Sequence, residues 1–454
     1  RLMAEALVSK YVQTQLRALN AALTNGQFVS VRKLLLELPP SDVAHILESS
    51  PSRTRDELWE LIDSDFHGDI LEELSDDVRN GIITKMLPAN VVDALEEMDT
   101  DDLAETLSSL PEPVLADILD SMDAQDRLRA EQALSYGEET AGFIMNTDTI
   151  TLRPDVTVDV VLRYIRLKGE LPENTDTFYV VNRTDNLVGI VPVARLLTAE
   201  TDNKVSEVMD EESEAIPVNM PDDEVASLFE RYNWLSAPVV DENNRLVGRI
   251  TIDDVVDIIR EDAEHSMMSM AGLDDDEDTF APVMQSTKRR SVWLAVNLVT
   301  ALMAAMVSDL FEAALSQLAV LAILNTIVPS MGGVAGNQTL TLVIRGMALG
   351  HVNASNSRWL ISKEIAIGFL NGAIWAILIA SVIALWKQDY MLGIIIAFAM
   401  MINMIAAALA GATLPMIMKR LKIDPALAGS VILTTITDVV GIFAFLGTAT
   451  LFLI

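Results

Sequence analysis

The sequence predicts a multidomain protein in which an acidic, globular half precedes an all-α membrane domain of five helices. The chain has 454 residues and a formal net charge of −34, yet its mean hydropathy is +0.32. The two properties lie in different parts of the chain. Residues 291–454 contain 7 Lys or Arg and 6 Asp or Glu, whereas residues 1–290 contain 25 and 60. This division excludes a single globular domain and a disordered chain.

Composition also bears on partners and chemistry. An acidic surface repels phosphate, so we expect no nucleic-acid partner. The absence of cysteine excludes disulfides and Cys-ligated metal centres. The four histidines show no paired ligand spacing, so we expect no zinc site. No nucleophile–base arrangement is present, so we predict that the protein is not an enzyme.

The membrane domain, residues 291–454, is predicted from five stretches that carry little charge. Each is long enough to cross a bilayer core, which needs about 20 helical residues. Lys and Arg cluster before the first stretch, between the second and third, and between the fourth and fifth, which the positive-inside rule requires of loops on one side. We therefore expect a multi-pass protein with the acidic half in the cytosol and the C-terminus outside. The stretches are Ser291–Ser308, Ala313–Ile344, Ile365–Trp386, Tyr390–Met418 and Pro425–Ile454.

Asp438 is the one charged residue that we expect deep in a span. It is the fourteenth of the thirty residues from Pro425 to Ile454. A central Asp costs ~2.5–3.5 kcal/mol on insertion scales, so it indicates a functional site. The alternative is an Asp that only joins helices by hydrogen bonds. The predicted spans offer no Lys or Arg as a partner, which argues against that alternative.

The second stretch contains a run of helix-weakening and polar residues between Pro329 and Gln338. Gly332 and Gly336 have the GxxxG spacing that permits close helix contact. Asn337 and Gln338 add amide oxygens. We expect a broken helix here, because irregular backbone is tolerated where it lines a water-filled cavity. The alternative is a simple packing face, but the presence of Asp438 favours a cation path.

Residues 1–137 are predicted to form a helical domain. Short amphipathic units recur about every 11–12 residues, and Asp, Pro or Ser stands where each helix would begin. Examples are 87–95, 98–107 and 110–119. We expect a small right-handed superhelical stack, as in repeat folds.

Residues 138–200 and 201–258 are predicted to be two copies of one α/β unit. The segment Val180–Ile190 recurs as Val239–Arg249, and each reads as a hairpin: an apolar strand, a polar turn and a second strand. An amphipathic helix precedes each hairpin, at Thr157–Lys168 and Asp222–Tyr232, and a helix follows it. This arrangement resembles tandem CBS domains.

Residues 259–290 are predicted to connect these copies to the membrane. An acidic helix, Asp253–His265, enters this region and leads through a flexible acidic stretch, 274–278.

The second copy has a segment through which CBS domains of this kind often bind adenine nucleotides. Its residues are Gly248, Thr251 and Asp254, with the hydroxyl expected at the phosphates and the carboxylate at the ribose. The first copy has Pro192 and Arg195 at the corresponding positions and lacks both groups. We therefore expect at most one ATP per chain, although the pair can also be purely structural.

The order of these parts resembles the MgtE family of magnesium channels and transporters over nearly the whole chain. The most specific marks are GGVAGNQTLTLVIR at 332–345 and ITDVVG at 436–441. The resemblance implies a homodimer in a bacterial-type plasma (inner) membrane, with one Mg²⁺ path along the two-fold axis. Asp438 matches the pore aspartate, and Asn337, Gly333 and Ala322 match positions that line the path.

The resemblance also implies that intracellular Mg²⁺ bridges the cytosolic domains and closes the pore. Three positions depart from the family pattern, Asn233, His265 and Ser430, and they leave the number of regulatory sites open. Competing interpretations are a transporter of another divalent cation, a CBS-regulated anion channel, and a membrane-anchored nucleotide sensor without transport. The matching metal positions are Asp101, Glu105, Asp254, Asp257, Asp262 and Asp424.

Overall fold

The computed structural model describes Leu19, Ala22 and residues 27–453, apart from 97, 173, 213, 274–276, 349 and 354. The predicted N-terminal helical domain, residues 1–137, is therefore described from residue 27 onward apart from 97, with Leu19 and Ala22 before it. Residues 274–276 of the acidic stretch also lie outside the described residues. The chain divides into two units, which we describe separately. The N-terminal unit comprises residues up to Asp262 together with 276–282, and the membrane unit comprises 263–275 and 283–454.

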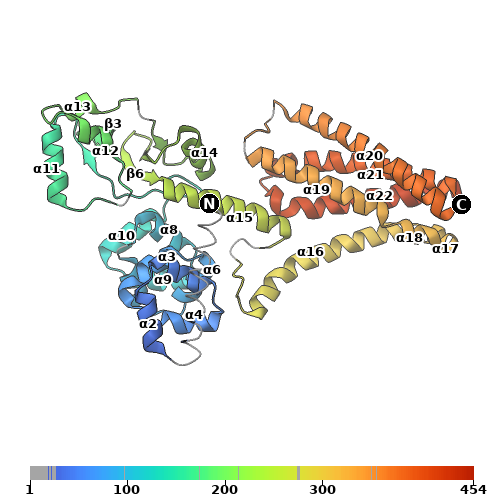
Figure 1. Ribbon diagram of the computed structural model, residues 1–454, viewed down its shortest axis with the longest axis horizontal. Coiled ribbons are helices and arrows are strands. Elements are labelled where there is room, and N and C mark those ends of the chain that lie inside the picture. Colours follow the sequence, from blue (N-terminus) through green and yellow to red (C-terminus); the bar gives the residue numbers. More distant parts are fainter. Residues whose placement is uncertain are drawn as a thin grey trace. The chain divides into compact units, whose positions relative to one another are not determined.

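The N-terminal unit begins with a stack of short helices, drawn in blue in Figure 1, as the sequence predicts. Pro40 and Pro88 stand in the first turn of their helices, where a missing backbone N–H costs no hydrogen bond. The Asp123 side chain caps another helix by accepting from two backbone N–H groups. Leucine, isoleucine and valine side chains fill one continuous core. The helices are α2 (Phe28–Leu36), α3 (Pro40–Glu48), α4 (Ser52–Trp59), α5 (His67–Glu72), α6 (Asp76–Ile83), α7 (Pro88–Leu95), α8 (Thr100–Ser108), α9 (Glu112–Ser121) and α10 (Ala124–Ala133), with a 3₁₀ turn at Ser64–Phe66.

Two three-stranded sheets of identical topology follow, which confirms the predicted repeat. In each sheet the first strand pairs parallel to the second and the second antiparallel to the third. The two hairpin turns bond to each other: the Leu187 N–H donates to the Asn244 carbonyl, and the Leu246 N–H donates to the Asp185 carbonyl. The strands are β1 (Thr151–Leu152), β2 (Thr177–Val181), β3 (Leu187–Pro192), β4 (Ile216–Pro217), β5 (Ser236–Val240) and β6 (Leu246–Thr251).

Helices pack against both sheets, and the last of them also contributes residues to the membrane unit. The last of them, α15 (Ile252–Ala271), runs without a break across the predicted boundary at 258/259. The predicted connecting region therefore consists of the end of α15, a short linker and the beginning of α16. The other helices here are α11 (Val158–Lys168), α12 (Val193–Thr198), α13 (Val205–Val208) and α14 (Asp222–Tyr232).

Among the described residues of the membrane unit, five helices are long and apolar enough to cross a membrane, as the sequence predicts. A short break at 325–326 divides the second span into α18 and α19. The fourth span, α21, is the most buried of the five, whereas α16 is almost entirely exposed in the single chain. The helices are α16 (Val283–Asp309), α17 (Glu312–Gln317), α18 (Ala319–Leu324), α19 (Ile327–Ala348), α20 (Ser357–Lys387), α21 (Tyr390–Arg420) and α22 (Pro425–Leu453) (Figure 1).

The expected break between Pro329 and Gln338 is wrong, because α19 is continuous through this run. Pro329 is only the third residue of α19, so it lacks a backbone N–H that would have no partner within the helix. The glycines are tolerated because neighbouring helices approach them closely. A Cβ atom built on Gly336 would lie 3.0 Å from the Leu433 side chain.

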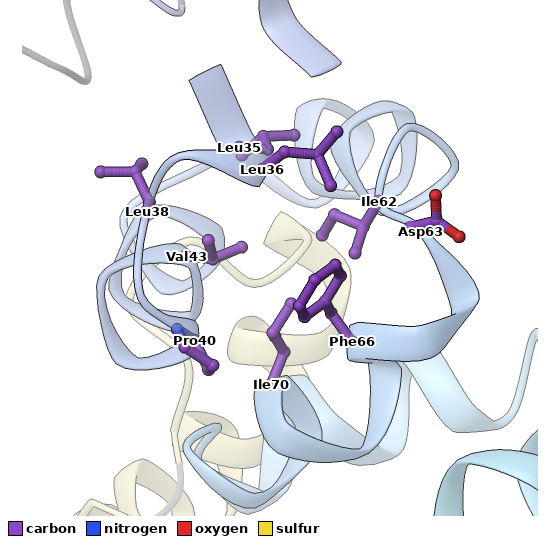
Figure 2. A pocket seen from close by; sticks show the side chains of 9 residues that line it. All are labelled: Leu35, Leu36, Leu38, Pro40, Val43, Ile62, Asp63, Phe66 and Ile70. Atoms are coloured by element: carbon purple, nitrogen blue, oxygen red, sulfur yellow. The ribbon is translucent and has the colours of Figure 1, made fainter. Parts of the chain in front are cut away.

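A small apolar pocket lies among the N-terminal helices, and its size argues against a functional site. Figure 2 shows apolar side chains around it, among them Val43 and Phe66, with Asp63 at its edge. Its volume of ≈ 20 Å³ is about that of a single water. Asp63 itself pairs with Arg32 at 3.0 Å.

Candidate ion path and acidic interface

Asp438 lies in α22, on a helix that packs antiparallel against α19 through small residues. The register follows from close approaches: Gly429 lies against Leu340, Gly336 against Leu433, and Gly441 against Pro329. Asp438 is partly exposed in the single chain, whereas its neighbour Thr437 is fully buried and donates to the Thr434 carbonyl.

Asn337 and Gly333 lie on α19, and Ala322 lies on α18, which precedes it in the same span. Asn337 is partly exposed on α19, and a Cβ atom built on Gly333 would lie 3.8 Å from the Thr437 hydroxyl. Ala322 is exposed on α18. The structure therefore brings Gly333 close to the segment that carries Asp438, and Asn337 places an amide group on α19, the helix that packs against this segment.

Sequence reasoning missed two buried polar groups in this unit. Asn403, fully buried in α21, donates from Nδ2 to the Val328 carbonyl at 2.8 Å. A Cβ on Gly332 or Gly441 would collide with the Asn403 amide. The signal was available, because a lone Asn in an apolar span is conspicuous.

The second missed group is the carboxylate of Glu364. Glu364 lies in α20 and is only 3% exposed. Sequence reasoning began the third span at Ile365 and so left this carboxylate outside, whereas α20 begins at Ser357.

In the N-terminal unit, carboxylates of the helical stack face carboxylates of the second repeat. Asp101 on α8 lies near Asp254 on α15, and burial together with this neighbour raises the Asp101 pKa well above its ordinary value. Its Oδ1 atom is buried without a hydrogen-bond partner. Burial and the charge of Glu105 raise the pKa of Asp102 to about 7.

The same interface continues along α15. Burial raises the pKa of Glu261 to about 7, with the charges of Glu105 and Asp76 adding to the effect. Burial likewise raises the pKa of Asp257, with Arg260 opposing and Glu105 adding. Glu105 and Asp257, two of the predicted metal-binding residues, therefore lie on opposite sides of one acidic interface.

Glu105 has a partner within its own domain. Arg79, which is almost fully buried, donates to Glu105 at 2.7 Å and also contacts Asp76. One guanidinium therefore offsets part of the negative charge at an interface that is otherwise rich in carboxylates.

The predicted nucleotide residues lie at the junction of β6 and α15, with Gly248 and Thr251 in β6 and Asp254 in α15. Asp254 accepts hydrogen bonds from the Thr251 backbone N–H at 2.9 Å and from the Thr251 hydroxyl at 3.0 Å. Burial raises the pKa of Asp254 to about 6. Gly248 has no room for a side chain, since a Cβ there would lie 2.9 Å from the Asn146 carbonyl oxygen. Asp254 thus takes part in both predicted sites.

The last two predicted metal residues fall in different units. Asp262 belongs to the N-terminal unit, where its charge contributes to a raised pKa of Asp222, which is caused chiefly by burial. Asp424 immediately precedes α22: it accepts from the backbone N–H groups of Ala426 and Leu427 at 3.0 Å and contacts His265 Nε2 at 3.2 Å. Among the residues that the structure describes, no three His, Asp or Glu side chains are close enough together to hold a metal ion.

Comparison with known proteins agrees with this architecture part by part. The model of the MgtE intracellular N domain matches residues 38–139, and the CBS domain model matches 141–202 and 205–261. The MgtE divalent cation transporter model matches 324–448. A protein of Bacillus subtilis, named magnesium transporter MgtE, is 31% identical over 95% of this chain and 96% of its own length. The chain belongs to the MgtE family.

Further MgtE relatives have lower identity but similar coverage. The magnesium transporter MgtE of Thermus thermophilus is 27% identical over 96% of this chain and 98% of its own. Among solved structures, the soluble part of a magnesium transporter has a TM-score of 0.50 at 25% identity, covering 56% of this chain and 99% of that one. The cytosolic domain of the Mg²⁺ channel MgtE in complex with ATP also has a TM-score of 0.50, at 28% identity, covering 54% and 99%.

Proposed function

We propose that this MgtE protein carries Mg²⁺ across a bacterial-type plasma membrane along a path that includes Asp438, Asn337, Gly333 and Ala322. The observation that carries the proposal is a partly exposed carboxylate on a spanning helix that packs closely against the glycines of α19. Carboxylate and amide oxygens suit Mg²⁺, which sheds its water reluctantly and usually keeps several waters when bound.

A homodimer fits this path. In one chain α16 is nearly bare and Asp438 has partial exposure, so a second copy would cover apolar surface and bring two carboxylates to one axis. Two Asp438 side chains would balance the 2+ charge of one ion. In this arrangement the N-terminal unit lies in the cytosol and the C-terminus lies outside.

The acidic interface of the N-terminal unit is proposed as the sensor of cytosolic Mg²⁺. Facing carboxylates at ~4 Å repel by ~4 kcal/mol at an effective dielectric of 20. The raised pKa values of Asp101, Asp254 and Asp257 mark groups whose charged form is strained in this docked arrangement. Divalent cations would relieve that strain, so Mg²⁺ favours the docked state and closes the pore.

Glu105, Asp262 and Asp424 are proposed to share these bridging ions. Asp262 is the last residue of the N-terminal unit on α15, and Asp424 contacts His265 of the same helix, which makes the two carboxylates suitable for passing the docked state on to the pore. Binding of ATP by Gly248, Thr251 and Asp254 is a further proposal, in keeping with the ATP complex of the related cytosolic domain.

The decisive experiment is ion flux into liposomes that contain the purified full-length protein. We expect Mg²⁺ uptake, with Co²⁺, Mn²⁺ and Ni²⁺ tested separately to define selectivity. Asp438→Asn keeps the side-chain shape and should abolish uptake, while Asp309→Asn at the exposed end of α16 should leave it unchanged. Uptake by Asp438→Asn equal to the parent would exclude the path. Anion flux, or no flux at all, would favour the competing anion-channel or sensor functions.

A further inference from the structure

Glu364 is an unusual side chain for a membrane domain. It is 3% exposed in α20, and both of its oxygens have partners. Oε2 accepts a hydrogen bond from the Thr339 hydroxyl at 3.2 Å, and Oε1 pairs with Lys363 Nζ at 3.2 Å. Burial of an ionisable group in a membrane helix is costly, so such a residue is expected to have a function.

The bond to Thr339 joins α20 to the helix that carries Asn337. Each helical residue turns by about 100°, so Thr339 and Asn337 lie about 200° apart on α19. The exposed fractions agree with that geometry. The side chain of Thr339 is only 7% exposed, whereas Asn337 is partly exposed and lies on the same side of α19 as the exposed Val334 and Thr341. Glu364 therefore contacts the side of α19 that is opposite to Asn337.

The element that carries Glu364 is itself closely packed. A Cβ on Gly368 of α20 would lie 2.6 Å from Ala408 of α21, and one on Gly411 of α21 would lie 2.7 Å from the Gly336 carbonyl of α19. Helices α19, α20 and α21 thus pack through small residues, which permit a short distance between helix axes but leave each helix able to rotate about its own axis. The hydrogen bond between Glu364 and Thr339 is directional, so it restrains the rotation of α19 in a way that contacts between glycines do not.

We propose that Glu364 is a positioning residue for ion permeation, which fixes the rotation of α19 through Thr339 and so keeps Asn337 directed to the ion path. This inference rests on the proposed path. Glu364 need not touch the ion. Its effect is transmitted through one hydroxyl, and that hydroxyl can be removed at nearly constant volume by Thr339→Val.

The absence of cysteine from the chain allows a direct test of rotation. A single Asn337→Cys reporter is placed in the full-length protein in liposomes, and its rate of modification by a charged methanethiosulfonate is measured. Adding Thr339→Val or Glu364→Leu should slow modification at least tenfold, and adding Thr339→Ser should change it less than twofold. A Leu167→Cys reporter on α11, which is 87% exposed and lies outside the spans, should react equally in all backgrounds. Unchanged modification in the Thr339→Val background would overturn the proposal.

Mg²⁺ flux provides the second readout. Thr339→Val should reduce uptake about tenfold in the parent and have less than a twofold effect in an Asn337→Ala background, because both changes act on one side chain. Equal losses in the two backgrounds would indicate a role independent of Asn337 and overturn the positioning role. Normal uptake by Asn337→Ala would overturn the proposed path at this residue. Impaired Asn337→Ala beside normal Thr339→Val would overturn the positioning alone.

Discussion

The guanidinium of Arg55 lies 2.9 Å from the carboxylate of Asp278, and both side chains are nearly buried, at 7% and 9% exposed. Arg55 also donates to the backbone carbonyls of Leu47 and Ser50. Asp278 belongs to the acidic stretch that the sequence suggested was flexible. This residue of the linker before α16 is instead anchored to the helical stack of the N-terminal unit.

We expect Arg55→Ala to destabilise the N-terminal unit by about 3–5 kcal/mol, because it leaves a buried carboxylate without its partner. The measurement is the thermal unfolding of the purified full-length protein. Arg53→Ala is the matched control: Arg53 pairs with Glu57 on the surface and is 91% exposed, so its loss should cost ~0–1 kcal/mol. Equal destabilisation by the two variants would contradict a specific role for the buried pair.

The local elements of this fold were predictable from the sequence because they depend on short-range patterns. The hairpins at 180–190 and 239–249 and the five spans follow from periodicity, length and charge. The Arg55–Asp278 pair joins residues 223 positions apart, and no local pattern indicates it. Glu364 was missed because hydropathy placed the edge of a span at the first apolar residue beyond it. The break at Pro329 was expected because the position of proline within the helix was unknown.

Acid should promote docking of the acidic interface without Mg²⁺. The pKa values of Asp102, Asp254 and Glu261 are raised to about 7, 6 and 7, so the docked form binds more protons than the separated form. Docking is therefore strongest below the ordinary carboxyl pKa near 4 and weakens as pH rises through about 6–7.

Spin labels on this cysteine-free chain can measure the docking. Asp117→Cys on α9 and Leu167→Cys on α11 provide exposed positions in the helical stack and the first repeat. Without Mg²⁺, the distance distribution between the labels should be narrow at pH 5 and broad at pH 8. Adding Asp102→Asn and Glu261→Gln should remove most of this difference. The same distribution at both pH values would contradict protonation as a substitute for Mg²⁺.

ATP binding, if Thr251 contributes its hydroxyl, should be sensitive to Thr251→Val. Thr251 is buried, at 5% exposed. Valine has nearly the same volume as threonine, so the substitution preserves packing and removes only the hydroxyl. We expect about tenfold weaker binding, or ~1.4 kcal/mol, in titration calorimetry of the full-length protein. Arg195→Ala, at the position of the first repeat that corresponds to Asp254, should leave the affinity unchanged. Two equivalent ATP sites per chain would refute the assignment to the second repeat.

Replacing Asp101, Asp254 and Asp257 together by Asn should leave the pore open at high Mg²⁺. Asn removes the charges that bridging ions would neutralise, and at 254 it retains an amide oxygen that can accept the bond from the Thr251 N–H. Moving a two-state equilibrium from 1:99 to 99:1 needs about 5.5 kcal/mol of differential binding. Several modest ion sites supply this together, so closure in the parent should be steep in Mg²⁺.

The matched control is a triple variant of exposed carboxylates on neighbouring helices, Asp93→Asn, Glu112→Gln and Asp117→Asn. Single-channel recording or flux at increasing Mg²⁺ should show closure of the parent and this control, with the interface variant remaining active. If the interface variant closes at the parent's Mg²⁺ concentration, the interface is not the sensor.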